Sequence, residues 1–521
     1  MVLQTDVAGN PAGHWCPTPW DKDSEDWKKI DSQLGPEHVA RKIDAVVAML
    51  DLSQLAASYA GVGSRAQRPD LMLKIVVYEI CQGRLSPAQW YRDIREHQPL
   101  QWLAFGIRPG RSRFYQFEQR LDEVVDELNL QGLALGIELR LTTATRAALD
   151  GSLIAANASR RQLLKETTLQ WRTAQLTAAI EDDRYGMTRA VVQPCRPVYT
   201  HPAWMAATAS GRLQQRTRYQ RACVAMQKLQ ARNQARPASQ RKPRKEIRLS
   251  VTDPEAPLGL DKENVYRPLY NVQLCQDLES PLILAYEVFA QTNDNGTVQP
   301  ILDRYLQLTG VLPKQMLADA GYATALEVAV FAAAGVELYA PFRENTLTAG
   351  KTKTPKQFPK SAFMWLPEEK VYICPENQRL TACGKEHKQQ SGERQLEVIQ
   401  YRCDPVHCTG CAQQGKCTRS PKKGRTVKRS EYDDLIDQLR ARMATAEAKW
   451  LYRLRKQTIE LSYADLKQHR HLRRFNGRGL RRARTQLGLL VLAHNGLTIA
   501  KARPASINQP QSDVSPEEIA A

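Results

Sequence analysis

A buried strand that ends on a carboxylate constrains the fold of this chain more than any other feature of the sequence. The segment LADAGY, residues 317–322, ends a buried strand that starts at Gln315. Its glycine then turns the chain into a helical stretch. Asp319 therefore stands at the carboxyl end of a strand, where an open α/β sheet presents its chemistry. We predict a sheet with helices packed on it, and we expect carboxylates from distant parts of the chain to meet Asp319 at this edge.

The composition indicates a basic protein that contacts a polyanion. The chain has 521 residues, a length that suggests about three domains, and its 42% of hydrophobic residues is enough for real cores. Its formal net charge is +19. Such a charge most often serves nucleic-acid binding, although a merely basic, soluble surface is the simpler alternative. No apolar run approaches the roughly 18 residues of a membrane-spanning helix, and no signal peptide is visible. We therefore expect a cytoplasmic protein with no membrane partner.

Helical periodicity dominates the first part of the chain. Both ends, residues 1–35 and 503–521, are polar and expected to be flexible or disordered. Residues 36–140 carry apolar side chains at three- and four-residue spacing, which predicts a helical domain. Near its end two short helices are joined by a turn with Gly and Pro, and Arg111 and Arg113 begin the second one. This pattern fits a DNA-binding helix-turn-helix, but an ordinary helical hairpin fits it as well.

Residues 141–342 alternate between strands and helices, which predicts the first part of a mixed α/β core. Within it, residues 267–277 and 280–290 are predicted to form a β-hairpin, and Asp294 and Thr324 are expected to cap the two helices that follow. Asp150 lies on the first strand and is followed by Gly151, a pair that usually marks a hairpin turn. A long insert, residues 160–250, comes next and is predicted to hold one or two long polar helices and a linker. Between residues 212 and 248 the insert holds twelve Lys or Arg and one acid. This basic part is either a solvated linker or a segment that contacts DNA.

Cysteines crowd the segment that interrupts this core, residues 343–430. The chain has 11 cysteines, and four of them follow one another at close spacing: Cys403, Cys408, Cys411 and Cys417. Four thiolates complete the tetrahedral shell of a structural zinc ion. Because the spacings are irregular and only one CxxC occurs among them, a small β subdomain without metal is an equal alternative.

The second part of the core, residues 431–502, is predicted to begin with one long helix and to close with an apolar one. Between residues 449 and 503 there are fourteen Lys or Arg against two acids. Glu460 is one of these acids, and on a continuous helix Lys456 and Lys467 share its face. For an isolated helix, an ion pair with Lys456 would be the ordinary explanation of Glu460.

Three carboxylates on separate elements, Asp150, Asp319 and Glu460, form a set with a recognisable chemistry. Phosphoryl transfer on nucleic acid uses two divalent metal ions about 4 Å apart to hold the attacking and leaving oxygens. Mg²⁺ takes its ligands from a few carboxylates and the substrate phosphate, and surrounding Lys and Arg hold the DNA backbone. One sheet with one helix behind it can bring three distant acids together.

Several segments of the chain, taken in order, resemble the bacterial insertion-sequence transposases of the DDE type. They include ALDGSLIAANAS, YNVQLCQD, LADAGY, YRLRKQTIELSYADLKQHRHLRRFNGRGL and QLGLLVLAHN. The resemblance covers roughly residues 35–500. It implies an α/β fold with an RNase H-like mixed five-stranded sheet, an all-α N-terminal domain and a small β, Cys-rich insertion.

The resemblance also implies the functional residues. Asp150, Asp319 and Glu460 would be the catalytic triad that binds two Mg²⁺ or Mn²⁺ ions. The DNA contacts that we expect are Arg455, Lys456, Lys467, Arg473, Arg474, Arg111 and Arg113. The family pattern is not kept everywhere, because Tyr452 and Arg455 lie one residue farther from the Glu, and residues 495–498 look less helical than in the family.

We therefore predict a DNA transposase that cuts at the ends of its element and joins them to target DNA. Its partners would be double-stranded DNA, as terminal inverted repeats and as target, and the pairing of two ends implies at least a dimer on DNA. Two other classes of protein stay open. A domesticated, non-catalytic DNA-binding protein would keep the fold, although the presence of all three acids argues against it. A zinc-ribbon regulator would explain the cysteines and leave the acids unexplained.

Overall fold

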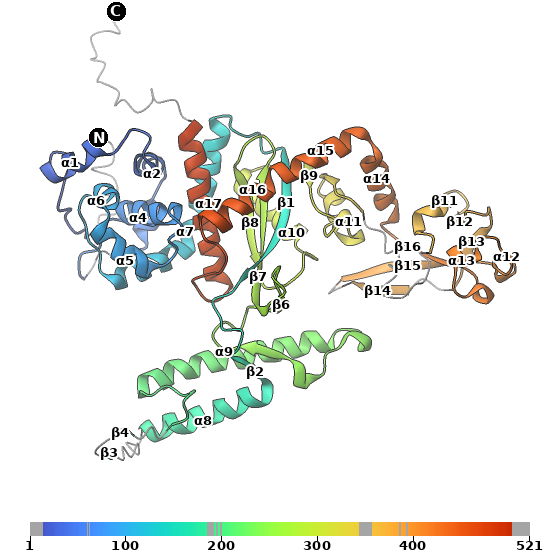
Figure 1. Ribbon diagram of the computed structural model, residues 1–521, viewed down its shortest axis with the longest axis horizontal. Helices are drawn as coiled ribbons and strands as arrows, with labels where there is room; N and C mark the ends of the chain where they lie inside the picture. The colour runs from blue at the N-terminus through green and yellow to red at the C-terminus, as the bar shows by residue number, and fades with distance from the viewer. Residues whose placement is uncertain are drawn as a thin grey trace, which may run out of the picture. The chain divides into compact units, whose positions relative to one another are not determined.

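The computed structural model shows a mixed α/β chain that divides into two compact units (Figure 1). The first unit comprises residues 1–293, 301–312 and 456–521, and the second comprises 294–300 and 313–455. The residues that the structure describes are 14–59, 61, 63–184, 192–193, 196–197, 201–342, 357–384, 387–391 and 394–502. The predicted tail, 503–521, lies outside them. In the described part, no helix combines the length and apolar character needed to cross a membrane.

Seven helices of the first unit form the helical region predicted for residues 36–140, with one of them starting earlier in the chain. They are α1 (Glu25–Gln33), α2 (Val39–Ala48), α3 (Ser53–Ala57), α4 (Pro69–Cys81), α5 (Pro87–Glu96), α6 (Gln98–Leu103) and α7 (Arg111–Glu138). Helix α1 lies in the segment that we expected to be flexible. It is held there because Trp27 stacks on Trp102 with ring centroids 5.5 Å apart and donates its indole N–H to the Trp102 carbonyl.

The predicted helix-turn-helix takes a different form. Its second helix is α7, which has 28 residues and buries Phe114, Phe117 and Leu128 along its length. The short α5 and α6 precede it, and Arg111 stands at its first position. A buried helix of this length supports the rest of the unit, and Arg111 is exposed at its start.

Four antiparallel strands lie at the centre of the first unit. The strands are β1 (Arg146–Ala155), β6 (Leu258–Leu260), β7 (Tyr266–Asp277) and β8 (Ile283–Phe289). β7 and β8 are the predicted hairpin. β1 pairs with β7 without interruption, including Asp150 opposite Leu274 and Gly151 opposite Gln273. The prediction of a turn at Asp150 was therefore wrong, because pairing along the whole strand outweighs the turn preference of an Asp-Gly pair.

Helix α17 (Leu480–Ala502) packs on β8 and on α7 (Figure 1). The Asn495 side chain exchanges two hydrogen bonds of 2.9 Å with the backbone of Ile283. Next to it, a Cβ at Gly496 would lie 2.9 Å from the Val46 side chain, so only glycine permits this approach of α2. Residues 495–498 are thus fully helical, which corrects the expectation of a weaker helix there.

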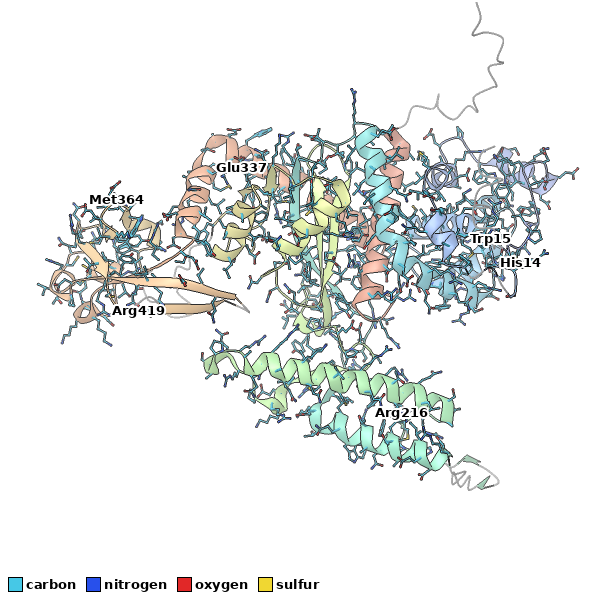
Figure 2. The ribbon with its side chains drawn as sticks, turned by 180° about the vertical axis from the view of Figure 1, so that it is seen from behind. His14, Trp15, Arg216, Glu337, Met364 and Arg419 are labelled. Atoms are coloured by element: carbon cyan, nitrogen blue, oxygen red, sulfur yellow. The ribbon has the colours of Figure 1, made fainter. Side chains whose placement is uncertain are left out.

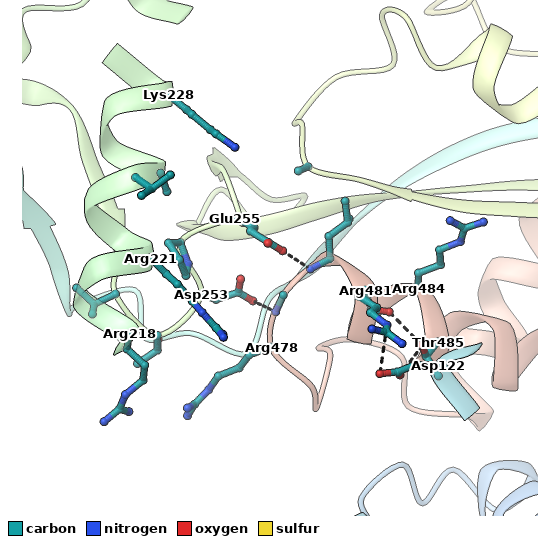
Figure 3. A pocket seen from close by; sticks show the side chains of 18 of the residues that line it. Asp122, Arg218, Arg221, Lys228, Asp253, Glu255, Arg478, Arg481, Arg484 and Thr485 are labelled. Carbon is teal, nitrogen blue, oxygen red and sulfur yellow. Dashed lines mark hydrogen bonds and ion pairs between the residues drawn. The ribbon is translucent and has the colours of Figure 1, made fainter. Parts of the chain in front are cut away.

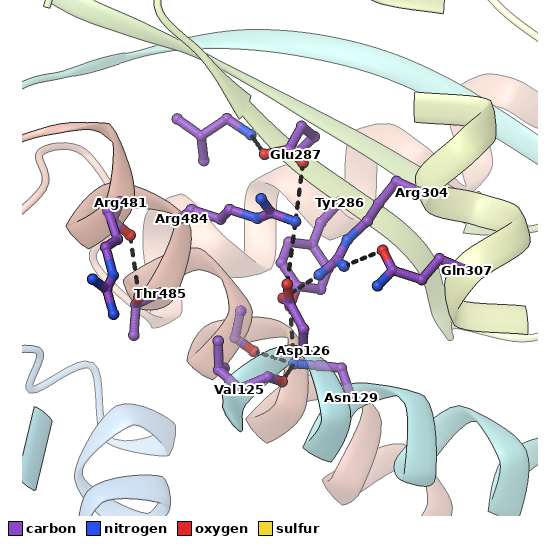
Figure 4. A network of polar contacts seen from close by, with 12 residues as sticks. Val125, Asp126, Asn129, Tyr286, Glu287, Arg304, Gln307, Arg481, Arg484 and Thr485 are labelled. Atoms are coloured by element: carbon purple, nitrogen blue, oxygen red, sulfur yellow. Dashed lines mark hydrogen bonds and ion pairs between the residues drawn. The ribbon is translucent and has the colours of Figure 1, made fainter. Parts of the chain in front are cut away.

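A polar network centred on Asp126 joins four elements of the first unit (Figure 4). The carboxylate of Asp126, on α7, accepts hydrogen bonds from the Tyr286 hydroxyl at 2.8 Å and from Arg304, and it pairs with Arg484 at 3.1 Å. Arg304 comes from α10 (Val298–Thr309) and its side chain is 2% exposed. Burial and the charge of Asp126 raise the pKa of Tyr286, so this phenol stays a hydrogen-bond donor.

The insert folds as a helical hairpin. Its elements are β2 (Leu163–Lys165), α8 (Glu166–Arg184), β3 (Val192–Gln193), β4 (Arg196–Pro197), α9 (Ala209–Gln234), the 3₁₀ turns η2 (Ala238–Gln240) and η3 (Arg244–Glu246), and β5 (Arg248–Ser250). Helices α8 and α9 share a small core that includes Leu176, Ala222 and Met226. Arg212 pairs with Asp183 across the hairpin, and Arg216 can be located on α9 in Figure 2. The long helices expected in this insert are therefore α8 and α9.

In the second unit, the strand that precedes Asp319 belongs to a strand–helix–strand element. β9 (Gln315–Leu317) runs parallel to β10 (Glu337–Tyr339), with α11 (Ala325–Ala333) between them. Thr324 caps α11 through the N–H of Glu327, as its sequence predicts. The Glu327 carboxylate instead accepts a hydrogen bond from the Gly296 N–H at 2.7 Å, which fastens the segment before α10.

The Cys-rich region is a second sheet. Its strands are β11 (Met364–Leu366), β12 (Val371–Ile373), β13 (Arg379–Ala382), β14 (His387–Ser391), β15 (Arg394–Cys403) and β16 (Thr426–Ser430). The short η4 (Lys360–Ala362), α12 (Pro405–Cys408), α13 (Gln414–Cys417) and η5 (Pro421–Lys423) lie around these strands in the chain. Tyr372, Tyr401 and Trp365 form its aromatic core, and Arg429 stacks over Trp365 at 4.0 Å.

The predicted long helix over residues 432–469 is broken into several elements. They are α14 (Asp433–Ala444), α15 (Ala446–Gln457), α16 (Ile459–Ala464) and η6, a π-helical turn (Asp465–His469). Thr458, between α15 and α16, has φ −112° and ψ −89°, outside the helical region. The expectation that Lys456, Glu460 and Lys467 share one face of a continuous helix was therefore wrong.

Candidate active site

Helix α16 carries Glu460 and is bonded to the strand that carries Asp150, both within the first unit. The Tyr463 hydroxyl lies 3.0 Å from the carbonyl oxygen of Asp150 and 2.8 Å from that of Val272. One residue earlier, the Ser462 hydroxyl donates to the side-chain oxygen of Gln276 at 2.5 Å. These bonds fix the helix across β1 and β7, with Ile459 buried beneath it and the Glu460 side chain exposed.

Lys467 is held beside the same strand. Its ammonium group donates to the Ser152 hydroxyl at 2.5 Å, two residues after Asp150. Burial, with the positive charges of Lys262 and Arg473, lowers the pKa of Lys467 to about 8, although the charge of Asp150 acts in the opposite direction. A partly buried cation next to a strand carboxylate is suited to receive a phosphate.

The second acid of this basic stretch, Asp465, has a structural role. Burial alone would raise its pKa, but the hydrogen bond from His494 and the charge of Arg470 hold the pKa well below the ordinary value. Arg470 Nε lies 2.8 Å from the carboxylate, and His494 also contacts the carbonyl of Pro281 at 2.8 Å. Asp465 thus ties the π turn to α17. The two acids of the stretch therefore differ, since Glu460 is exposed and Asp465 lies within an ion-pair cluster.

Asp319 follows β9 in the second unit, as its sequence context predicts. Its carboxylate accepts a hydrogen bond of 2.7 Å from the N–H of Gly321, which orients the side chain at the strand end. A Cβ at Gly321 would lie 2.9 Å from Asp319 Oδ1 and 3.6 Å from Asp294 Oδ2. Asp294 is therefore a second carboxylate close to Asp319. From the sequence we saw it only as a helix cap, and the run Asn293–Asn295 ahead of α10 is the signal that it offered.

The predicted DNA-binding cations occupy different environments. Arg473 and Arg474 are exposed. Their segment crosses the end of β1, where Ala155 exchanges backbone hydrogen bonds with Arg473 and with Phe475. Lys456 and Arg111 are also exposed. Arg113 donates to the Ser64 hydroxyl at 3.1 Å. Arg455, in the second unit, is only 9% exposed and offers little surface to a phosphate.

Five cysteines, one more than we predicted, line a small cavity of about 20 Å³ in the Cys-rich sheet: Cys374, Cys403, Cys408, Cys411 and Cys417. All five are free thiols. Burial raises the pKa of Cys403 to about 12, and a hydrogen bond with Cys408 contributes. Cys374 was left out of the predicted set because it lies 29 residues before Cys403 in the chain, on a different strand end.

The side-chain arrangement shows neither the predicted carboxylate site for Mg²⁺ nor the predicted cysteine site for zinc. Among the residues that the structure describes, no group of three or more His, Cys, Asp or Glu is arranged to hold a metal ion. The types of donor do fit, since carboxylate oxygens suit Mg²⁺ and thiolates suit zinc. Both metals therefore stay predictions.

Comparison with known families supports one class of protein. A family model described as a transposase DDE domain matches residues 373–498, about a quarter of the chain. The match runs from the Cys-rich sheet through α16 into α17, so it includes Glu460 but neither Asp150 nor Asp319. It supports assignment to a DDE transposase family. No curated protein and no solved structure matches the chain.

Proposed function

We propose that this protein is a DNA transposase that cleaves DNA at the ends of its element and joins the new ends to target DNA. The observation that carries the proposal is the position of Glu460. It lies inside the segment matched by the transposase model, on a helix that Tyr463 bonds to the strand of Asp150. The Glu460 side chain is exposed, so it is accessible to a bound ion or a DNA phosphate.

The three acids have one proposed role. Asp150, Asp319 and Glu460 would hold two Mg²⁺ or Mn²⁺ ions, which would stabilise the developing charge on the phosphate and activate the nucleophile. The RNase H-like arrangement of the sheet belongs to this proposal. Asp294, beside Asp319, would help to keep that end of the site acidic.

The chemistry consists of two displacements at phosphorus. In the first, a water oxygen attacks the phosphorus at the element end, and the bond from phosphorus to the 3′-oxygen breaks, leaving a 3′-hydroxyl. In the second, that 3′-oxygen forms a bond to a phosphorus of the target, whose own 3′-oxygen leaves. Lys467 would hold the phosphate beside Asp150 throughout, and exposed Arg473 and Arg474 would bind the neighbouring backbone.

The helical N-terminal region would recognise the terminal inverted repeats, with Arg111 at the exposed start of α7 as its leading contact. Because two ends must be brought together before insertion, we propose at least a dimer in the DNA complex.

A cleavage assay tests this function. Purified protein is incubated with Mg²⁺ and a duplex that carries the element's own terminus, and the appearance of a 3′-hydroxyl at the junction is measured. Asp319→Asn should abolish the product. The matched control is Asp303→Asn, which changes an exposed acid of α10 and should cut like the wild type. DNA binding without any Asp319-dependent cleavage would instead indicate a non-catalytic DNA-binding protein.

A further inference from the structure

A groove of about 1220 Å³ lies within the first unit, between the helical insert and the start of α17 (Figure 3). One wall is α9. The other is formed by the loop before α17 and its first turns, and the segment from Val251 to Glu255 contributes to the lining. None of the residues that line it is among the acids or cations assigned to the proposed active site.

Helix α9 presents a row of cations to this groove. Arg218, Arg221, Lys228 and Arg232 line it, and all four side chains are exposed. They recur at intervals of three, seven and four residues, which places them on one face of the helix. The opposite face packs in the hairpin core through Ala222 and Met226. The hairpin core therefore fixes which face of α9 is turned to the groove.

The opposite wall adds three arginines, Arg478, Arg481 and Arg484. Arg484 is engaged with Asp126 at 3.1 Å and Glu287 at 3.4 Å, and the exposed Arg481 pairs with acids of α7. Arg478 lies in the loop before α17 and is exposed. Figure 3 shows it beside the groove, across from Arg218.

The carboxylates that line the groove do not neutralise Arg218, Arg221 or Lys228. Asp253 accepts from the N–H of Gly479 at 3.2 Å, and Glu255 accepts from the N–H of Leu480 at 2.6 Å, so both are used to fasten the loop before α17. The remaining three are Asp122, Asp126 and Glu287, which pair with Arg481, Arg482 or Arg484. In the described part of the chain, Arg218, Arg221 and Lys228 have no carboxylate partner.

We propose that this groove binds the phosphate backbone of DNA at a position separate from the catalytic acids, which deepens and rests on the transposase function proposed above. Like charges on one helix face repel one another, and a polyanion relieves that repulsion. From Arg218 to Arg232 the row is about 21 Å long, which corresponds to about six base pairs along a duplex. A single small anion would neutralise only one end of such a row.

The exposed apolar side chain of Val224 supports this assignment. It lies in the middle of the cationic row, lines the groove, and is 52% exposed. An apolar group between phosphate-binding cations can contact the sugar edge of a backbone. Contacts from these cations to phosphate oxygens would hold a duplex without reading its base sequence.

Fluorescence anisotropy of a labelled duplex over a series of salt concentrations tests the groove, with the full-length protein. The test variant is Arg218→Gln/Arg221→Gln/Lys228→Gln. The control is Arg236→Gln/Lys242→Gln/Lys245→Gln, which removes the same charge from exposed positions of the same insert outside the groove. The slope of log K against log salt should fall by about two to three in the test variant, and affinity near 0.15 M salt by roughly 10- to 100-fold. The control should stay close to the wild type.

A third variant, Arg218→Lys/Arg221→Lys, retains the charges and should keep the salt slope, which separates charge loss from misfolding of the hairpin. The inference is overturned if the test variant binds like the wild type, or if the control loses as much affinity. Failure of the proposed function would give a different result. Wild-type protein would then still bind DNA with a salt slope that depends on the groove, but it would show no cleavage that depends on Asp319.

Discussion

The ammonium group of Lys467 lies 2.5 Å from the hydroxyl of Ser152, and this contact joins the π-helical turn after α16 to the strand of Asp150. Two residues that are 315 positions apart in the chain are therefore direct neighbours. The Tyr463 hydroxyl also bonds to the Asp150 carbonyl, so α16 and the turn after it are both fastened to β1.

We expect Lys467→Ala to weaken DNA binding to the same extent for every DNA sequence, because a phosphate contact carries no sequence information. The slope of log K against log salt should fall by about one. Lys467→Arg should keep the slope. Lys501→Ala, which removes an exposed lysine from the end of α17, is the matched control. A Lys467→Ala variant with an unchanged slope would show that this ammonium group only holds Ser152.

The network of Asp126 predicts a large loss of stability. Asp126→Ala would leave the Arg304 guanidinium, which is 2% exposed, without its acid. Breaking a buried ion pair in this way costs about 3 kcal/mol or more of the free energy of unfolding, which urea denaturation measures. Glu123→Ala removes an acid on the same helix whose side chain is 73% exposed and should cost less than about 1 kcal/mol. Equal losses would contradict the importance of the buried network.

Glu79 predicts a dependence of stability on pH. It is fully buried on α4, and burial raises its pKa to about 8, with the adjacent Asp93 adding to the shift and Arg84 opposing it. Between the ordinary value of 4.5 and about 8, the folded chain keeps a proton that the unfolded chain has lost. The contribution of this group to stability is therefore present at low pH and is lost as the pH rises through that range.

We expect Glu79→Gln to remove this dependence and to raise the melting temperature at pH 8 more than at pH 5. Thermal unfolding across the range measures the effect. Glu96→Gln, an exposed acid of the neighbouring α5, should leave the pH profile unchanged. Parallel profiles for wild type and Glu79→Gln would show that the buried carboxyl does not bind the extra proton.

The cavity lined by cysteines predicts which Cys→Ser substitutions would remove a bound zinc ion. If zinc is present, metal analysis of the purified protein should find about one ion per chain, and Cys408→Ser should remove it. Cys374→Ser should weaken binding too, because Cys374 lines the same cavity. Cys383→Ser is the control, since Cys383 does not line the cavity. Wild-type protein without zinc and with unchanged folding after chelation would leave a metal-free, Cys-rich sheet.

Much of the fold could be predicted where local pattern and tertiary structure agree. The hairpin of β7 and β8, the strand before Asp319 and the closing apolar helix all follow from runs of apolar residues bounded by turns. Thr324 was also recognised as the cap of α11, because capping depends on neighbouring residues only.

The rest depended on partners far away in the chain. The Asp150–Gly151 pair has the local signature of a turn, but pairing with β7 keeps it extended. The break at Thr458 has no Gly or Pro to announce it, and it appears only because α16 is fastened to β1 and β7 by Tyr463. The inclusion of Cys374 beside the later cysteines follows from the pairing of β13 with β15, which spacing along the chain does not show.

The most direct test of the account is whether the three acids act as one catalytic unit. The rate of Mg²⁺-dependent cleavage at the element end is measured for Asp150→Asn, Asp319→Asn, Glu460→Gln and the triple variant. Residues that act together are strongly non-additive, so each single change should lower the rate by at least about 100-fold and the triple variant should be little worse. Near wild-type cleavage by any one of the single variants would contradict the assignment.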